Sequence, residues 1–254
     1  MNQWLIASLI FLVAYTINLF FISIVYHRSL AHGGIVLHPL LRKFALNAGV
    51  WIVGIDPVAW SCMHRLHHKY SDTARDPHSP TQHSAPGLLL AQLKSYEKII
   101  RRLMVRDPAY TEVVADLEAP VHFLYRKGLW FLPYTIHAAI ALTLGFLTTS
   151  PIIALGYFLG MMSHPVQGWL VNYFGHHSGY RNFDLDDKST NCTLVGWFVF
   201  GEGYQNNHHR YPNSAKFSVK WFEVDPGYGL AQVLRVVGLV RIPQDEVKSY
   251  PVAS

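Results

Sequence analysis

Three short stretches of this sequence concentrate histidines at spacings that suit metal binding. They read "HRSLAH", "HRLHH" and "QNNHH", at residues 27–32, 64–68 and 205–209. A helix would place His64, His67 and His68 on one face, because residues three and four apart are neighbours on a helix surface. The third stretch repeats this spacing, with a glutamine in the first position. Imidazole binds iron, copper, nickel and zinc, so the pattern predicts a metal site without naming the metal.

The candidate ligands are too many for one ion. On a regular helix His27 and His32 would point about 140° apart at 3.6 residues per turn, so they suit a helix end or two different metals. Asn172 and His176 stand four apart at the end of an apolar stretch. A catalytic zinc keeps about three protein ligands, so eight imidazoles imply two metals with open positions. These eight are His27, His32, His64, His67, His68, His176, His208 and His209.

Motifs for other chemistry are missing from the sequence. There is no H-E-x-x-H of zinc proteases and no Glu-x-x-His of carboxylate-bridged di-iron bundles. Neither a dinucleotide-binding glycine fingerprint nor a G-x-S-x-G nucleophile elbow occurs. The two cysteines, Cys62 and Cys192, form no C-x-x-C pair. This excludes a disulfide framework and a thiolate zinc site.

The elements that must position the histidines are apolar. Half of the 254 residues are hydrophobic, only 15% are charged, and the mean hydropathy is +0.15. Residues 4–26 carry no charge and could cross a hydrocarbon core of about 30 Å. The uncharged stretches 129–148 and 151–174 predict a membrane hairpin, and 44–63, which contains a Gly, an Asp and a Pro close together, predicts an interfacial or re-entrant helix. We therefore expect an all-α membrane protein with three to four transmembrane helices, in a single domain over 1–254.

Basic residues predict the orientation. Lys and Arg flank the apolar stretches, whereas the leading "MNQ" and the "TTSP" turn carry none. By the positive-inside rule the N-terminus faces out, and all three histidine stretches face the cytoplasm together with a helical cap over 175–254. The net charge of +5 fits basic loops against anionic lipid, and no motif for nucleic-acid binding accompanies it. We expect an integral, multi-pass protein of a bacterial inner membrane.

Four longer segments carry a resemblance to a known family. They read "YHRSLAH", "HRLHHKYSDTARDPHSP", "WLVNYFGHHSGYRNF" and "GEGYQNNHHRYP". In this order they resemble the membrane fatty acyl desaturases, most closely the delta-9 or stearoyl-CoA branch. The resemblance implies an oxygen-dependent enzyme with two ferrous ions held by the eight histidines, and with Asn172 binding a metal directly or through water. It implies a supporting position, beside the ligands, for His78.

The sequence departs from the family pattern at three places. It has room for one span before the first histidine stretch, where the family usually has two. Cys62 and Met63 stand where animal acyl-CoA members have a charged pair, which puts recognition of CoA by the same contacts in doubt. Gln205 stands where a further histidine is expected. Its amide can orient a neighbouring ligand or a bound water, so our hypothesis is that one iron has one fewer protein ligand.

The activity implied by the resemblance is insertion of a cis double bond, at the delta-9 position, into a saturated acyl chain. The acyl group would be carried by CoA, acyl carrier protein or a phospholipid, and a separate ferredoxin, rubredoxin or cytochrome b5 would supply two electrons. Candidate channel residues are Trp60, Trp169, His137 and His164, although the two histidines could instead hydrogen-bond to neighbouring helices. The alternatives are a histidine-box hydroxylase of an alkane, sterol or carotenoid, and, more distantly, a membrane zinc hydrolase or a metal-binding protein without activity.

Overall fold

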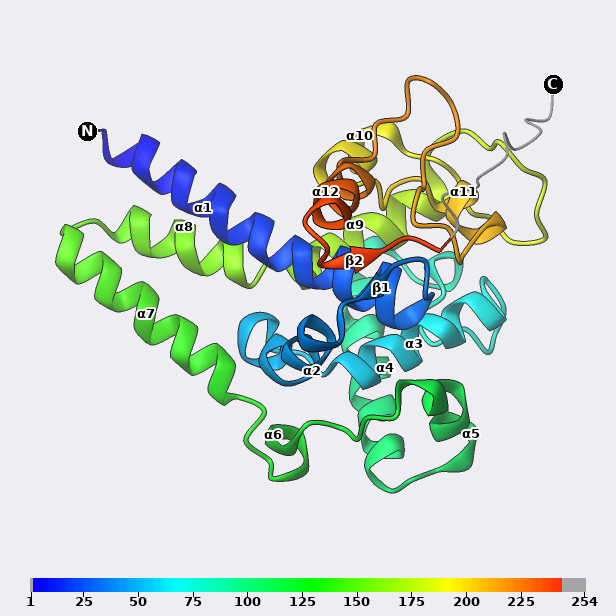
Figure 1. Ribbon diagram of the computed structural model, residues 1–254, viewed down its shortest axis with the longest axis horizontal. Coiled ribbons are helices and arrows are strands. Elements are labelled where there is room, and N and C mark those ends of the chain that lie inside the picture. The colour runs from blue at the N-terminus through cyan, green and yellow to red at the C-terminus, as the bar shows by residue number, and fades with distance from the viewer. Residues whose placement is uncertain (1, 244–254) are drawn as a thin grey trace.

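The computed structural model describes residues 2–243, which are mostly helical, in agreement with the predicted all-α class (Figure 1). A two-residue strand β1 (Val36–Leu37) pairs antiparallel with β2 (Val240–Arg241). The helices are α1 (Gln3–Leu19), the π-helix η1 (Phe20–Ala31), α2 (Pro39–Val53), α3 (Pro57–Tyr70), η2 (Pro80–Gln82), α4 (Ala85–Met104), α5 (Pro108–Thr111), η3 (Glu112–Leu117), α6 (Phe123–Arg126), α7 (Leu132–Thr148), α8 (Pro151–Met161), α9 (His164–His177), α10 (Thr193–Phe198), α11 (Gln205–Arg210) and α12 (Pro226–Val236).

Helices α1, α7 and α8 form an apolar arm that projects from the body made by the other elements (Figure 1). Glycines on α8 allow α1 to lie close along it. A Cβ at Gly156 would come within 2.8 Å of the Ala7 carbonyl oxygen, and one at Gly160 within 2.7 Å of Ala14 Cβ. Two glycines four residues apart in an apolar helix are a typical packing surface between helices in a membrane.

The first helix is the clearest candidate for a membrane span. α1 continues into η1 as one apolar helix, Gln3–Ala31, of 29 residues. At about 1.5 Å per residue it would extend about 40 Å, which exceeds the hydrocarbon thickness of a bilayer. α7 and α8 are shorter, with 17 and 11 residues. The helix thus leads from the arm into the body and ends there with its histidines.

Two of the predicted stretches are broken in the structure. The stretch 151–174 is divided between α8, which ends at Met161, and α9, which begins at His164. Pro165 in the first turn of α9 has no N–H to donate, so it suits a helix start and not a helix interior. The stretch 44–63 is divided between α2 and α3, which are bent by 89° relative to each other.

The corner between α2 and α3 is built by the residues that interrupt the apolar pattern. Gly54 ends α2 with φ +79°, a conformation that glycine adopts without strain. The Asp56 carboxylate then accepts hydrogen bonds from the backbone N–H groups of Ala59, at 2.8 Å, and His122, at 2.7 Å. Asp56 thereby caps α3 and ties the corner to the segment before α6.

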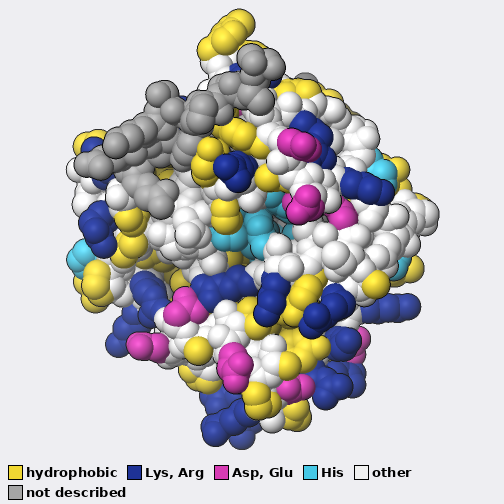
Figure 2. Space-filling model, turned by 90° about the vertical axis from the view of Figure 1, so that its right-hand side faces the viewer, with side chains coloured by type: hydrophobic (Ala, Val, Ile, Leu, Met, Phe, Trp, Pro, Cys, Tyr) yellow, Lys and Arg dark blue, Asp and Glu magenta, His cyan; other side chains and the backbone are white. Residues whose placement is uncertain are grey.

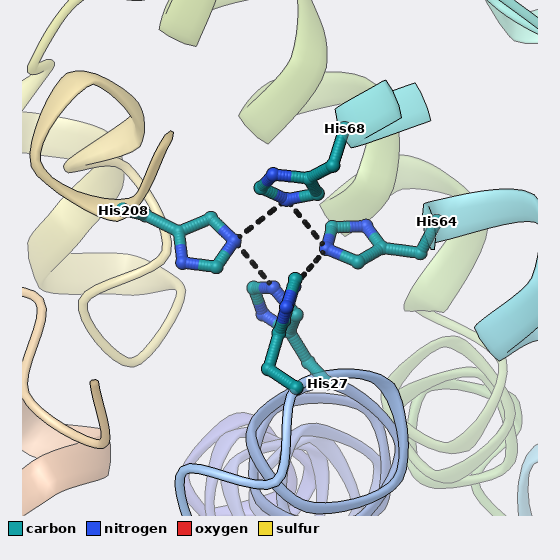
Figure 3. Close-up of side chains that lie close together, drawn as sticks. His27, His64, His68 and His208 are labelled. Carbon is teal, nitrogen blue, oxygen red and sulfur yellow. Dashed lines mark hydrogen bonds between the residues drawn. The ribbon is translucent and has the colours of Figure 1, made fainter. Parts of the chain in front are cut away.

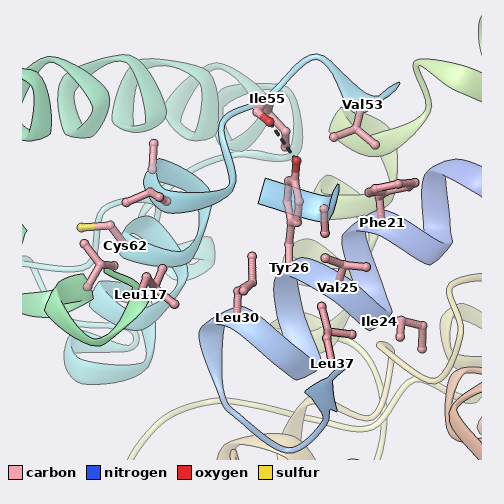
Figure 4. Packing of buried hydrophobic residues seen from close by; sticks show 14 of the residues in the cluster. Phe21, Ile24, Val25, Tyr26, Leu30, Leu37, Val53, Ile55, Cys62 and Leu117 are labelled. Carbon is pink, nitrogen blue, oxygen red and sulfur yellow. Dashed lines mark hydrogen bonds between the residues drawn. The ribbon is translucent and has the colours of Figure 1, made fainter. Parts of the chain in front are cut away.

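A hydrophobic core holds η1 against α2 and α3 (Figure 4). Ile24, Val25 and Tyr26 are fully buried in it, and the Tyr26 hydroxyl donates to the Ile55 carbonyl at 3.2 Å. Full burial of one such side chain contributes about 1.5–3 kcal/mol. This packing brings the end of η1 alongside α3, so the first and second histidine stretches face each other.

Candidate metal centre

Five of the eight predicted ligands converge on one point (Figure 3). The Nε2 atoms of neighbouring imidazoles lie 2.8 to 3.0 Å apart in the pairs His27–His208, His32–His64, His64–His68 and His68–His208. Nitrogens of neutral imidazoles that gather this closely can be satisfied together by a cation at their centre. This five-histidine group is His27, His32, His64, His68 and His208.

The π-helix explains how His27 and His32 reach the same group. The His32 N–H donates to the His27 carbonyl at 3.2 Å, a hydrogen bond that spans five residues. In a π-helix the hydrogen bonds join residues five apart, and the turn is wider than in an α-helix, so such residues point in more similar directions than they would on an α-helix. The two imidazole centroids are 5.1 Å apart. Both residues lie at the end of η1 and in one group, which fits the helix-end arrangement, one of the two that the sequence left open.

The other three ligands form a second group, His67, His176 and His209. Each histidine stretch on a helix is thus divided between two groups: α3 gives His64 and His68 to the first and His67 to the second. In α11, His208 belongs to the first group and His209 to the second. The imidazole centroids of His68 and His209 are 4.5 Å apart, so the groups adjoin each other. This arrangement suits two neighbouring metals, one with five histidine ligands and one with three.

Carboxylates fix the orientation of four of the imidazoles. In each case a carboxylate oxygen lies 2.5 to 3.0 Å from the histidine Nδ1, in the pairs His27–Glu202, His67–Asp76, His176–Asp72 and His209–Asp187. An Nδ1–H that donates to a carboxylate leaves the Nε2 lone pair free for a metal. Within the described residues, the buried Nε2 atoms of His67, His176 and His209 have no hydrogen-bond partner. The donor set therefore fits a metal in the three-histidine group as well.

The charge states also suit a cation. Burial lowers the pKa of His208 well below its ordinary value and that of His209 to about 4, so both are neutral ligands at pH 7. Burial alone would raise the pKa of Asp76, but the hydrogen bond from His67 outweighs it and lowers the pKa to about 2. Burial would also raise the pKa of Asp187, but the hydrogen bond from His209 outweighs this effect and lowers the pKa. Neutral imidazoles backed by ionised carboxylates favour a bound cation.

The four carboxylates were not identified from sequence. A signal was available for some of them, because Asp76 lies in the "DPH" of the second segment and Glu202 is the second residue of the fourth. Asp72 lies in the same second segment, whereas Asp187 lies outside all four segments. Asp72 reaches both the His176 Nδ1, at 2.9 Å, and the Lys188 N–H, at 2.8 Å.

Arg28 connects the first histidine stretch to the C-terminal part of the chain. Arg28 is 1% exposed, and its guanidinium lies 2.8 Å from the Asp225 carboxylate and 3.5 Å from that of Glu202. It also stands 4.0 Å from the centre of the Phe217 ring. A buried arginine is stable only with such partners. Arg28 therefore holds Glu202 in place, and Glu202 holds His27.

The supporting residues predicted from sequence lie beside the centre. Gln205 is buried, its amide N–H donates to the Glu202 carbonyl at 2.9 Å, and a Cβ at Gly175 would overlap its side chain. Gly175 thus leaves room for Gln205 next to His176. His78 is buried and stacks on His67, with centroids 4.9 Å apart. Asn172 lies on α9, one turn before His176.

A largely apolar cavity of about 790 Å³ approaches the five-histidine group. Trp60 lines it and stacks on the His64 imidazole, with centroids 5.1 Å apart and rings 10° from parallel. His164, another channel candidate from the sequence, also lines the cavity. Trp169 and His137 are not among its lining residues. The Trp169 indole donates to the Ala85 carbonyl, and His137 bonds to the Tyr157 hydroxyl and the Trp51 carbonyl.

One face of the molecule is hollowed above the centre. Figure 2 shows histidine side chains at the bottom of this hollow, with lysine and arginine side chains and some acidic side chains around it. Basic residues follow the histidine stretches directly in sequence, at Lys69 and Arg210, and both are exposed. The centre is therefore reachable from a positively charged surface.

Comparisons with known proteins agree with the resemblance. Residues 2–231 match the family model described as fatty acid desaturase. The chain is 33% identical over 221 residues to an sn-1 stearoyl-lipid 9-desaturase of Anabaena variabilis, which covers 86% of this chain and 76% of that protein. It is 30% identical over 243 residues to delta-9 acyl-lipid desaturase 1 of Arabidopsis thaliana, with coverage of 92% and 75%. An acyl-CoA 5-desaturase of Anemone leveillei is 28% identical over 223 residues, with coverage of 87% and 67%.

Proposed function

Because the chain belongs to the fatty acid desaturase family, we propose that it is an oxygen-dependent di-iron enzyme that inserts a cis double bond at delta-9 into a saturated acyl chain. The observation that supports this most directly is the convergence of eight histidines into two adjoining groups. In the balanced reaction the acyl chain gives up two hydrogen atoms and an external donor gives two electrons. Together with two protons, these hydrogens and electrons reduce one O2 to two waters.

Iron supplies the oxygen chemistry needed to remove hydrogens from an unactivated alkyl chain, which side chains cannot do by acid or base catalysis. The five-histidine group would hold one ion and His67, His176 and His209 the other. Asn172, one turn before His176 on α9, would complete the second set directly or through water, and the Gln205 amide would orient a neighbouring ligand or that water by hydrogen bonding. The carboxylates of Glu202, Asp72, Asp76 and Asp187 would hold each bonded imidazole in the tautomer that offers Nε2.

The cavity would bind the acyl chain and keep bulk water away from it. Its wall nearest the centre is formed by Trp60 and Met63, and most of its lining is apolar. Trp60 touches both the cavity and His64, so it would place the reacting part of the chain beside the five-histidine group. Correct placement of a reacting carbon is worth much of the rate enhancement in such a site.

The electrons would come from a separate acidic carrier such as a ferredoxin, rubredoxin or cytochrome b5. The hollow surrounded by lysine and arginine offers that carrier a complementary surface (Figure 2). We further propose that the arm spans a bacterial inner membrane several times, with the N-terminus outside and the metal centre on the cytoplasmic side. The bent pair α2 and α3 would then lie at the membrane interface or enter it as a re-entrant element.

The test is the fatty acid profile of a desaturase-deficient host that expresses this chain, measured by gas chromatography and mass spectrometry. A new monounsaturated acid that is absent with His208→Ala or His209→Ala would support the proposal and give the double-bond position. A hydroxylated acid in its place would contradict desaturation and support a hydroxylase. Zinc in the purified protein, with no dependence on oxygen, would contradict both.

A further inference from the structure

Carboxylates are distributed unevenly between the two histidine groups. Each imidazole of the three-histidine group has its Nδ1 against a carboxylate, whereas among the described residues of the five-histidine group only His27 has such a partner. The side chains of these four carboxylates are at most 14% exposed, so water and salt screen their charges little. The three-histidine group therefore has three buried carboxylates one imidazole away from its metal position, and the five-histidine group has one.

The hydrogen bonds of these carboxylates are those of the ionised form. Asp76 accepts from two backbone N–H groups, both at 3.0 Å, in addition to the His67 imidazole. Asp187 accepts from the backbone N–H and the hydroxyl of Ser189 as well as from the His209 imidazole. All of these neighbours are donors, and a carboxylate that only accepts carries its negative charge.

A buried arginine increases the difference between the groups. Arg28 lies 3.5 Å from Glu202, the one carboxylate that bonds to the five-histidine group. The Arg28 charge is shared with Asp225, 2.8 Å away, but Asp225 has no contact with a histidine of the group among the described residues. Part of the negative charge of Glu202 is therefore offset next to His27.

The remaining basic residues act in the same direction. The Arg65 guanidinium donates at 2.8 Å to the carbonyl that precedes His32, and its ion-pair partner Asp116 is 62% exposed and thus screened by water. No lysine or arginine among the described residues forms an ion pair with the three carboxylates of the other group. Arg181 and Lys188, which lie in the loop after α9, are exposed. The surroundings of the three-histidine group are thus the more negative.

From this uneven charge we propose that the two metal positions favour ions of different charge. When the centre contains one Fe3+ and one Fe2+, Fe3+ lies in the three-histidine group and Fe2+ in the five-histidine group. Nearby negative charge, and imidazoles made more basic by carboxylates, both stabilise the higher oxidation state. One electron from the external donor converts two Fe3+ into this mixed pair, and a second electron gives two Fe2+. This inference rests on the proposed di-iron function and assigns the first electron to the five-histidine group.

Asp72→Asn removes one charge and can keep the hydrogen bonds. The Asp72 Oδ2 accepts from His176 and from the Lys188 N–H, whereas Oδ1 is buried and has no partner among the described residues. The asparagine carbonyl can take the place of Oδ2, and its NH2 group that of Oδ1. Asp72 has a φ of 60°, a conformation in which asparagine is enriched. The variant therefore tests the charge with little change in shape.

The experiment is a reductive titration of the full chain loaded with 57Fe, in which Mössbauer spectroscopy counts Fe2+ and Fe3+ at each potential. We expect two separate one-electron steps. Asp72→Asn should raise the ratio of Fe2+ to Fe3+ in the second step about 10–100-fold at a given potential, which is about 60–120 mV, and should shift the first step much less. Asp186→Asn, an exposed carboxylate next to Asp187, is the control and should shift neither step. A shift of the first step alone, or of neither step, would overturn the proposal.

Ions that do not change oxidation state test the same assignment without turnover. The metal-free protein is given one equivalent each of Zn2+ and Ga3+, which have the charges of Fe2+ and Fe3+, and X-ray absorption at the two edges counts the imidazoles around each ion. Three around Ga3+ and five around Zn2+ would support the proposal. The reverse, or equal counts for both ions, would overturn it and leave the desaturase function standing. A protein that holds neither iron nor these ions would overturn the di-iron function together with this inference.

Discussion

Replacing Asp187 by asparagine would weaken one metal position and spare the other. The Asp187 Oδ2 lies 2.7 Å from the His209 Nδ1, and Oδ1 accepts from the Ser189 N–H at 2.9 Å. Asparagine keeps the size, but its amide N–H toward His209 would oppose the Nδ1–H and favour protonation at Nε2. Loss of such a partner usually lowers metal affinity 10–100-fold, which is about 1.4–2.7 kcal/mol.

The assay is iron content after dialysis against chelators of graded strength, measured by mass spectrometry. We expect Asp187→Asn to fall to about one equivalent at a chelator strength that leaves two in the unchanged protein, because only His209 of the three-histidine group loses its partner. Asp186→Asn, an exposed neighbour, is the matched control. Equal retention of iron by Asp187→Asn and the unchanged protein would refute the reasoning that this carboxylate holds His209 for a metal.

Three further changes test the centre, the arm and the cavity. Gln205→Ala should lower iron content and activity while Gln205→His keeps both, as measured by metal analysis and product yield; an alanine variant that behaves normally would contradict the role given to Gln205. Gly160→Leu should destabilise the protein by about 1–3 kcal/mol, seen as a lower Tm, because the new side chain would meet α1. Gly229→Leu, the control, should leave the Tm unchanged because there is open space around Gly229. A Tm of Gly160→Leu equal to that of the unchanged protein would count against close α1–α8 packing. Gly168→Leu should reduce activity on long acyl chains with iron content unchanged, since Gly168 lines the cavity; full activity would place the acyl chain elsewhere.

The convergence of the histidines could be predicted from sequence better than their division into two groups. Local spacing correctly selected histidines that converge, since two helical stretches each present neighbouring imidazoles. It could not show that α3 and α11 each divide their histidines between two groups, because that depends on how the helices cross. The pairing of His27 with His32 was also hidden, because the π-helical hydrogen bond from His32 to His27 does not follow from residue spacing.

The fold was predictable where apolar patterns were long and less so elsewhere. The apolar part of the first helix, residues 4–26, follows from an uninterrupted hydrophobic run, and the break near Gly54 follows from an interrupted one. The division of 151–174 at His164 was missed, although Pro165 was a local sign of it. The carboxylates of Asp72 and Asp187 were missed because their contacts come from distant segments: Asp72 meets His176 across 104 residues.

The long separation in sequence between histidines of the same group determines when, during synthesis of the chain, a metal could bind. His27 and His208 are 181 residues apart and their Nε2 atoms lie 2.9 Å apart. A metal that joins them closes a long loop. The loss of conformational entropy on closing this loop corresponds to a free energy on the order of 5 kcal/mol, comparable to the effect of a long-range disulfide. The group cannot assemble until α11 has been synthesised, so iron would enter late, after most of the chain has left the ribosome. In a cell short of iron, no metal would join the C-terminal half of the chain to the first histidine stretch. Proteases would then degrade such chains, and the amount of this protein would follow the supply of the metal.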